Sequence, residues 1–157
     1  STLHTNSAIR SSPRLKDLGV APDVIAGNII GIIAQRLLRR LCVHCREQVQ
    51  VQAGSAEARI LGAEHVGRTI YQHHSGGCDA CDYQGYKGRL AIMELLRFDA
   101  ELDELITRNA TLGELNAHAL AKGFVPIAED GLRRVLEGIT SIEEVGRVVD
   151  LTVRLSR

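Results

Sequence analysis

The sequence predicts a mainly α-helical protein of the α+β class that carries a metal-binding subdomain. The four cysteines fall into two Cys-x-x-Cys pairs, separated by an arm that spans residues 46–77. From Asp99 onward, residues that favour helix starts alternate with apolar residues at helical spacing. The chain of 157 residues fits one domain or two small ones, and it is long enough to form a core without the metal.

The first 41 residues are predicted to form one short strand followed by helices. Residues 1–5 are typical of a strand, and residues 7–19 have weak helical character that Pro13 interrupts. Gly19 precedes an expected apolar helix that begins at Pro22 or Asp23 and ends at Leu41. Its most apolar part, residues 24–34, is too short to span a bilayer.

Basic residues flank the cysteines, and two interpretations of them are open. Cations in the last turns of a helix offset its negative end by about 0.3–1 kcal/mol each, and cations near thiolates balance their charge. Contact with a nucleotide or with a neighbouring subunit is the alternative. The residues concerned are Arg36, Arg39, Arg40, Arg46, Lys87 and Arg89.

The two cysteine pairs predict a structural zinc site with Cys42, Cys45, Cys78 and Cys81 as ligands. Two tight turns that each supply two thiolates complete a tetrahedron around zinc, and no position is left for a catalytic water. Disulfides would need an oxidising compartment, and residues 1–6 show no signal-peptide pattern. A thiol oxidoreductase would need one pair at a helix N-terminus with a lowered thiol pKa, and it would leave the other pair unexplained.

The arm between the cysteine pairs, residues 46–77, is predicted to contain a strand and a short helix. Val49 and Val51 alternate with glutamines, as in a half-buried strand, and a helix is expected from Ala56 to Leu61. Three histidines in or beside this region could in principle bind metal. With four thiolates already available they are interpreted as surface residues: His65, His73 and His74.

The last third of the chain is predicted to be a small helical bundle. Asp99 caps the first helix, and Thr111 with Glu114 forms a capping box for the second. A third helix is expected over residues 128–137, and residues 140–143 cap the last one.

Charge and aromatic content argue against nucleic acid as a partner. Lys plus Arg equals Asp plus Glu at 19 each, so the net charge is zero and there is no general attraction to a polyanion. Aromatic residues make up 3% of the chain and tryptophan is missing, so platforms for base stacking are scarce. A stand-alone zinc-binding adaptor is therefore the weaker alternative.

Four motifs taken together resemble the carboxy-terminal part of one family. This family is the ATPases of type II secretion and type IV pilus assembly (the general secretory pathway protein E family). The resemblance covers residues 1–149 in the family's order. The motifs are Ser1–Asn6, Gln35–Cys42, Gly77–Cys78 with Gly85–Arg89, and Glu129–Leu132 with Gly138–Val145.

The resemblance implies three subdomains: the terminal strand and helices of a RecA-like α/β ATPase domain over residues 1–41, a tetracysteine zinc-binding subdomain over 42–95, and a helical subdomain over 96–157. It implies that His4 is the histidine expected near the γ-phosphate of ATP. Arg36 and Arg89 are expected at a nucleotide or a subunit interface.

The resemblance further implies a cytoplasmic, hexameric motor at the inner face of the bacterial inner membrane. ATP hydrolysis with Mg²⁺ would drive pseudopilus or pilus assembly, and the partners would be neighbouring subunits, inner-membrane platform proteins and the preceding part of the same ATPase. The chain contains no Gly-x-x-x-x-Gly-Lys-Ser/Thr loop for the phosphates. The 157 residues alone are therefore not expected to hydrolyse ATP, and the sequence does not separate type II secretion from pilus assembly.

Overall fold

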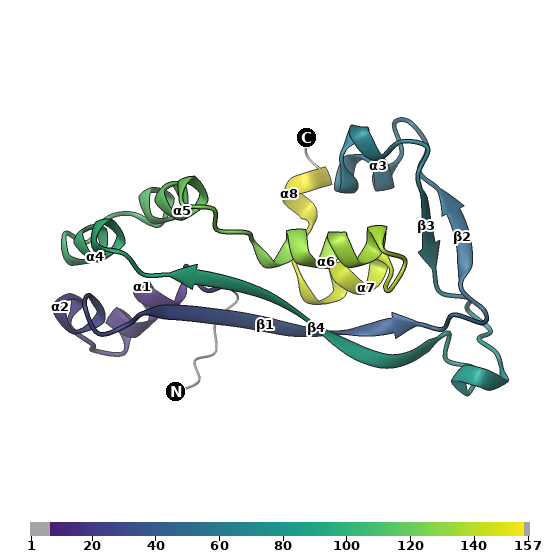
Figure 1. The fold of residues 1–157 in the computed structure, drawn as a ribbon, viewed down its shortest axis with the longest axis horizontal. Helices are drawn as coiled ribbons and strands as arrows, with labels where there is room; N and C mark the ends of the chain where they lie inside the picture. Colours follow the sequence, from purple (N-terminus) through teal and green to yellow (C-terminus); the bar gives the residue numbers. More distant parts are fainter. Residues whose placement is uncertain (1–6, 156–157) are drawn as a thin grey trace. The chain divides into compact units, whose positions relative to one another are not determined.

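The computed structural model describes residues 7–155, which form two compact units (Figure 1). The first unit comprises the chain up to Gln35 together with Met93–Ile127, and the second comprises Arg36–Ile92 with the chain from Ala128 onward. The expected strand over residues 1–5, with His4, lies outside the described residues. The described part is mixed α+β, with α-helices and two-stranded antiparallel sheets.

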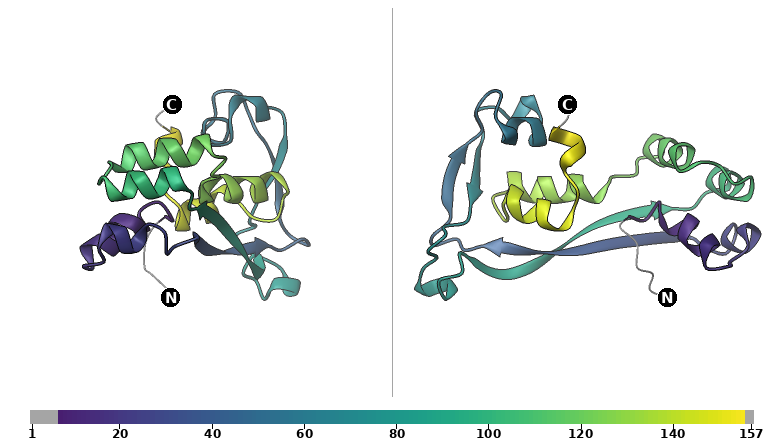
Figure 2. Two further views of the ribbon diagram at one scale, coloured as in Figure 1. Left: turned by 60° about the vertical axis from the view of Figure 1, so that its left-hand side comes forward. Right: turned by 180° about the vertical axis from the view of Figure 1, so that it is seen from behind.

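Short helices around an apolar core form the first unit. Its helices are α1 (Ser11–Asp17), α2 (Pro22–Ile25), α4 (Ala100–Thr107) and α5 (Leu112–Ala121). Helices α4 and α5 lie side by side in Figures 1 and 2. The buried residues of this core are Ala8, Ile9, Ile25, Ala34, Leu96, Leu102, Ile106, Leu115 and Ala119.

A buried carboxylate joins three segments of the first unit. Glu94 is 3% exposed. One of its oxygens accepts a hydrogen bond from the backbone N–H of Ala8, and the other accepts one of 2.8 Å from the N–H of Ile127. Both oxygens of Glu94 are thus satisfied by backbone donors, which compensates the cost of burying the carboxylate.

The long strand pair contradicts the predicted apolar helix over residues 22–41. Helix α2 ends at Ile25, and β1 (Gly31–Leu41) pairs with β4 (Tyr86–Arg97). The arrows of the two strands point in opposite directions in Figure 1. A short apolar run is ambiguous between helix and strand by periodicity alone, and here a distant partner strand supplies the hydrogen bonds.

The arm between the cysteine pairs folds as predicted in its main parts. Strand β2 (Glu47–Gln50) pairs antiparallel with β3 (Thr69–Gln72), with Val49 opposite Ile70. Helix α3 (Ala56–Leu61) lies between them in sequence, and the Ser55 hydroxyl caps it by accepting from the Ala58 N–H. The β2–β3 strand pair is seen from behind in the right-hand view of Figure 2.

The remaining elements of the second unit are helical. They are the 3₁₀ turns η1 (Ala63–His65) and η2 (Asp79–Cys81), and helices α6 (Ile127–Leu136), α7 (Ile142–Val148) and α8 (Thr152–Leu155). Helix α8 packs against α3, and the Arg154 guanidinium donates to the Ile60 carbonyl at 2.9 Å.

The predicted helix starts beyond residue 98 are confirmed. The side chains of Asp99, Thr111 and Ser141 accept from the backbone N–H of Leu102, Glu114 and Glu144, respectively, at the starts of α4, α5 and α7. The predicted single bundle is not confirmed, because α4 and α5 belong to the first unit and α7 and α8 to the second. In the part of the chain that the structure describes, no helix combines the length and apolarity needed to cross a bilayer.

Candidate functional site

Two tight turns position the four cysteines. Cys42 follows β1, and its N–H donates to the Gly85 carbonyl at 3.0 Å, which ties the first turn to the second. In the second turn the carbonyl of Cys78 accepts from the N–H of Cys81 and from that of Tyr83, each at 3.0 Å. Gly77 has φ +57°, and a Cβ there would lie 2.3 Å from the Tyr83 carbonyl carbon, so this turn requires glycine.

The sulfur atoms are spaced as zinc ligands would be. All four Sγ atoms lie within 4.8 Å of one another. The pairs Cys42–Cys78, Cys45–Cys81 and Cys78–Cys81 are each separated by 3.8 Å. Zn–S bonds of about 2.3 Å give a regular tetrahedron with edges of about 3.8 Å. The cluster could therefore hold one metal ion.

The electrostatics of the cluster favour a bound cation. Burial opposes ionisation of Cys81, but hydrogen bonds from the N–H groups of Cys78 and Gly85 outweigh it and lower the pKa of Cys81 to about 6. Burial and then the neighbouring cysteines raise the pKa of Cys45 to about 12. Ionising all four thiols side by side is therefore unfavourable, because the thiolates repel one another. A bound divalent cation would offset this repulsion.

The histidines near the cysteines have other partners. Nδ1 of His74 lies 2.6 Å from a Glu47 oxygen, and Nδ1 of His73 lies 3.3 Å from one of Glu143. The His73 ring also stacks on Tyr86 with a centroid distance of 5.2 Å. Within residues 7–155, the one group of candidate metal ligands consists of cysteines alone.

The basic residues near the cysteines do not share one role. Lys87 donates to the Ala80 carbonyl at 2.7 Å, inside the second cysteine turn. The Arg46 guanidinium stacks on Tyr71 at 4.0 Å and donates to the Gly138 carbonyl, which ties the arm to the end of α6. Arg36, Arg39 and Arg40 lie on strand β1, so the predicted role at a helix C-terminus is wrong for them.

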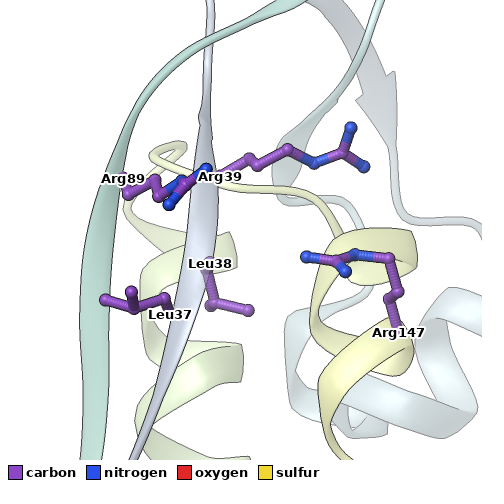
Figure 3. Close-up of a pocket in the computed structure, with 5 residues that line it drawn as sticks. All are labelled: Leu37, Leu38, Arg39, Arg89 and Arg147. Atoms are coloured by element: carbon purple, nitrogen blue, oxygen red, sulfur yellow. The ribbon is translucent and has the colours of Figure 1, made fainter.

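A second candidate site is a cavity of about 450 Å³ in the second unit (Figure 3). Strand β1 contributes Leu37, Leu38 and Arg39, strand β4 contributes Arg89, and helix α7 contributes Arg147. Figure 3 shows the Arg39 side chain leaving β1 and the Arg147 side chain leaving α7 toward the strand. Of the two arginines predicted from the sequence, Arg89 lines this cavity and Arg36 does not.

A buried carboxylate, Glu144, holds two of the cavity's arginines. Its side chain is fully buried. Arg39 donates to it from its backbone N–H and from Nε and Nη2, at 2.7–2.9 Å. Arg147 donates from Nε at 3.1 Å and from Nη2 at 2.7 Å. Burial alone would raise the pKa of Glu144, but the bonds from Arg147 and Arg39 lower it to about 2.

Aromatic stacking also supports Arg39. Its guanidinium carbon lies 4.1 Å from the centre of the Tyr86 ring, and the Tyr86 hydroxyl lies 3.3 Å from that of Ser141. Glu144 lies in the Gly138–Val145 motif, but its role and that of Arg147 were not predicted from the sequence. The spacing of three residues between an acidic and a basic residue on one helix was the available signal for their pairing.

Comparisons with known proteins identify relatives of this chain. The family model described as "Type II/IV secretion system protein" matches residues 1–147. A type IV pilus assembly ATPase, TfpB of Acinetobacter baylyi, is 41% identical over an aligned length of 157, and the alignment covers 97% of this chain and 26% of the relative.

Relatives from type II secretion and from pilus assembly match equally well. Type II secretion system protein E of Pseudomonas aeruginosa is 42% identical over 94% of this chain and 29% of its own length. The type IV pilus assembly ATPase PilB of Thermus thermophilus is 42% identical over 92% of this chain and 16% of its own length. The chain therefore spans 16–29% of the lengths of these relatives.

Proposed function

Because the chain belongs to the type II/IV secretion system protein family, we propose that it forms the carboxy-terminal part of a secretion-motor ATPase. In that protein, ATP hydrolysis would drive assembly of a pseudopilus and secretion across the bacterial outer membrane. The relatives named as type II secretion and type IV pilus proteins are equally similar, so a pilus assembly ATPase is the second candidate.

The cysteine cluster is proposed to be a structural zinc site, and its geometry is the observation that carries this proposal. Three of its S–S separations are 3.8 Å, which matches the edge of a tetrahedral zinc–thiolate site. With four protein ligands no position stays open for substrate, so the metal would stabilise structure. Cys42, Cys45, Cys78 and Cys81 would bind it as thiolates.

The zinc site would hold the arm of residues 46–77 as a rigid projection. Both ends of the arm join a cysteine turn, and Arg46 fastens its beginning to the carbonyl of Gly138. Because metal binding is coupled to folding of the ligand turns, the ion would order this loop-rich segment where a core could not. We infer that the arm docks on neighbouring subunits or on the inner-membrane platform of a cytoplasmic, hexameric motor.

ATP hydrolysis would need residues beyond the 157 of this chain. The chain has no phosphate-binding Gly-rich loop with its lysine, so ATP and Mg²⁺ would bind to the preceding part of the ATPase. His4 would act near the γ-phosphate, and Arg36 and Arg89 would contact the nucleotide or a neighbouring subunit. The guanidinium of Arg89 is free to do so, because none of the described residues is hydrogen-bonded or ion-paired to it.

The test of the zinc site is the metal content of the chain purified under reducing conditions without added metal. We expect one zinc per chain by elemental mass spectrometry, with free thiols appearing only after chelation. Cys45→Ser and Cys81→Ser should lose the metal, whereas His73→Gln and His74→Gln should keep it. A chain without metal whose four thiols react freely would contradict the zinc site.

The test of the motor function uses the longer ATPase that contains this chain. Cys45→Ser in that protein should abolish secretion or pilus formation while the protein is still produced, and His74→Gln is the matched control. Secretion and a cooperative thermal unfolding transition that both survive Cys45→Ser would refute the docking role. Loss of secretion with normal metal content in His74→Gln would show that the arm acts independently of zinc.

A further inference from the structure

We propose that the cavity lined by Arg39, Arg89 and Arg147 is a binding site for a phosphate-type polyanion, and that Glu144 positions its arginines. The zinc proposal does not involve this cavity. The inference does not depend on the motor function either, because every residue of the site lies within the second unit of the chain.

The charges of the cavity leave it strongly positive. Three guanidinium groups line it, and two of them, those of Arg39 and Arg147, contact the carboxylate of Glu144. One carboxylate neutralises one of the three, so two positive charges remain to face a ligand. A single arginine would balance the charge of Glu144, so the second arginine on the same carboxylate adds a positive charge that an anion can balance.

The donors of the two paired arginines are only partly used inside the protein. Glu144 engages Nε and Nη2 of both Arg39 and Arg147, and the described residues provide no acceptor for Nη1 of either one. Side-chain exposure is 45% for Arg39 and 54% for Arg147, so both remain accessible to a ligand. Arg89, which has no ion-pair partner among residues 7–155, supplies the third guanidinium.

The geometry favours phosphate groups over a single carboxylate. Arginine presents its N–H groups in a planar fork that matches the oxygens of phosphate, and two excess positive charges suit a ligand with at least two negative charges. Glu144 holds Nε and Nη2 of both Arg39 and Arg147, and the guanidinium of Arg39 stacks on the Tyr86 ring at 4.1 Å. A free polyphosphate and the phosphate chain of a nucleotide share this chemistry.

Isothermal titration calorimetry of the purified chain with inorganic pyrophosphate tests the proposal. We expect saturable binding that weakens as salt is raised, because the contacts are ionic. Arg89→Gln and Arg147→Gln should each weaken binding about tenfold, the loss of one charge-assisted hydrogen bond. Arg68→Gln is the matched control, since Arg68 lies on the same unit and does not line the cavity.

A second variant separates positioning from simple charge. Glu144→Gln makes the cavity more positive, so tighter pyrophosphate binding would overturn a positioning role, whereas weaker binding in a folded variant would support it. Absence of saturable binding, or equal losses in Arg68→Gln and Arg89→Gln, would overturn the site itself. A repeat titration with ATP distinguishes the sources: equal affinity indicates free polyphosphate, and tighter ATP binding indicates a nucleotide.

Discussion

Replacing Glu144 by glutamine should destabilise the chain substantially, although the two side chains have the same size. The glutamine keeps one accepting oxygen, but it places an NH2 donor where the other carboxylate oxygen accepted from the arginines, and it loses the charge that Arg39 and Arg147 neutralise. Two guanidinium groups would then face each other across a neutral, fully buried amide. The loss should appear as a lower free energy of unfolding.

The pKa of Glu144 sets the magnitude. It lies at about 2 in the folded chain against an ordinary value of 4.5. A pKa lower by about 2.5 corresponds to roughly 3 kcal/mol of preference for the charged form in the folded state. Both arginines are about half exposed, so solvent screens part of their interaction with Glu144. We therefore expect Glu144→Gln to lower the free energy of unfolding by about 2–3 kcal/mol.

The pH dependence follows from the direction of the shift. A carboxylate whose pKa is lowered on folding contributes stability above its unfolded pKa, near 4.5, and loses it as the pH falls through the folded value near 2. The difference in stability between the natural chain and Glu144→Gln should therefore be full at pH 7 and shrink steadily between pH 4.5 and 2. Urea unfolding followed by circular dichroism measures this difference.

One complication of the assay cancels in the comparison. Acid protonates the cysteine thiolates and releases any bound metal, but it does so in both proteins, so both are measured with chelator present. Carbon-13 NMR of the Glu144 carboxyl gives its pKa directly. The reasoning would be refuted if Glu144→Gln lowered the free energy of unfolding at pH 7 by less than about 0.5 kcal/mol. A stability difference that stays constant down to pH 2 would refute it as well.

Two further predictions concern packing and capping. Gly131→Ala in α6 should lower the free energy of unfolding, measured in urea, by about 1–2 kcal/mol. The new Cβ would lie 2.9 Å from the Val145 side chain, and this close contact outweighs the better helix propensity of alanine. Gly146→Ala in α7, whose Cβ would meet only an ordinary contact at 3.7 Å, is the control and should be neutral or stabilising, so equal losses would contradict the packing argument. Thr111→Ala should lower the free energy of unfolding by about 1 kcal/mol, because it removes the cap of α5, and Thr111→Ser should keep most of that stability. If the serine variant were as unstable as the alanine variant, the hydroxyl would not contribute to the cap.

Local signals predicted much of the helical structure. The caps at Asp99, Thr111 and Ser141 depend on hydrogen bonds to residues three positions ahead, so a short window of sequence contains all of the information. Helix α3 was predicted over Ala56–Leu61 from the residue pattern, and the structure adds a local cap at Ser55. The proximity of the two cysteine pairs was inferred from chemistry, because one tetrahedral ion needs two such turns.

The segment that became β1 shows the limit of such reasoning. Residues 31–41 contain apolar residues that suit either a helix or a strand, and the predicted helix was wrong. Strand β4 decides the matter, since it provides the hydrogen-bonding partner, and no local pattern had identified it as a strand. Ile32 and Ile33 favoured a strand as β-branched residues, but propensity is a weak signal without its partner.

By itself, the sequence determined the cysteine set, the helix starts beyond residue 98 and the family resemblance, because each rests on residues whose chemistry is recognisable at short spacing. Only the tertiary structure decided that residues 31–41 are a strand and that Glu144 clamps Arg39. These features join residues far apart in the chain, and their energies arise from burial and from partners that only the fold brings together. The arginine cavity belongs to this second class, since β1, β4 and α7 each contribute part of it.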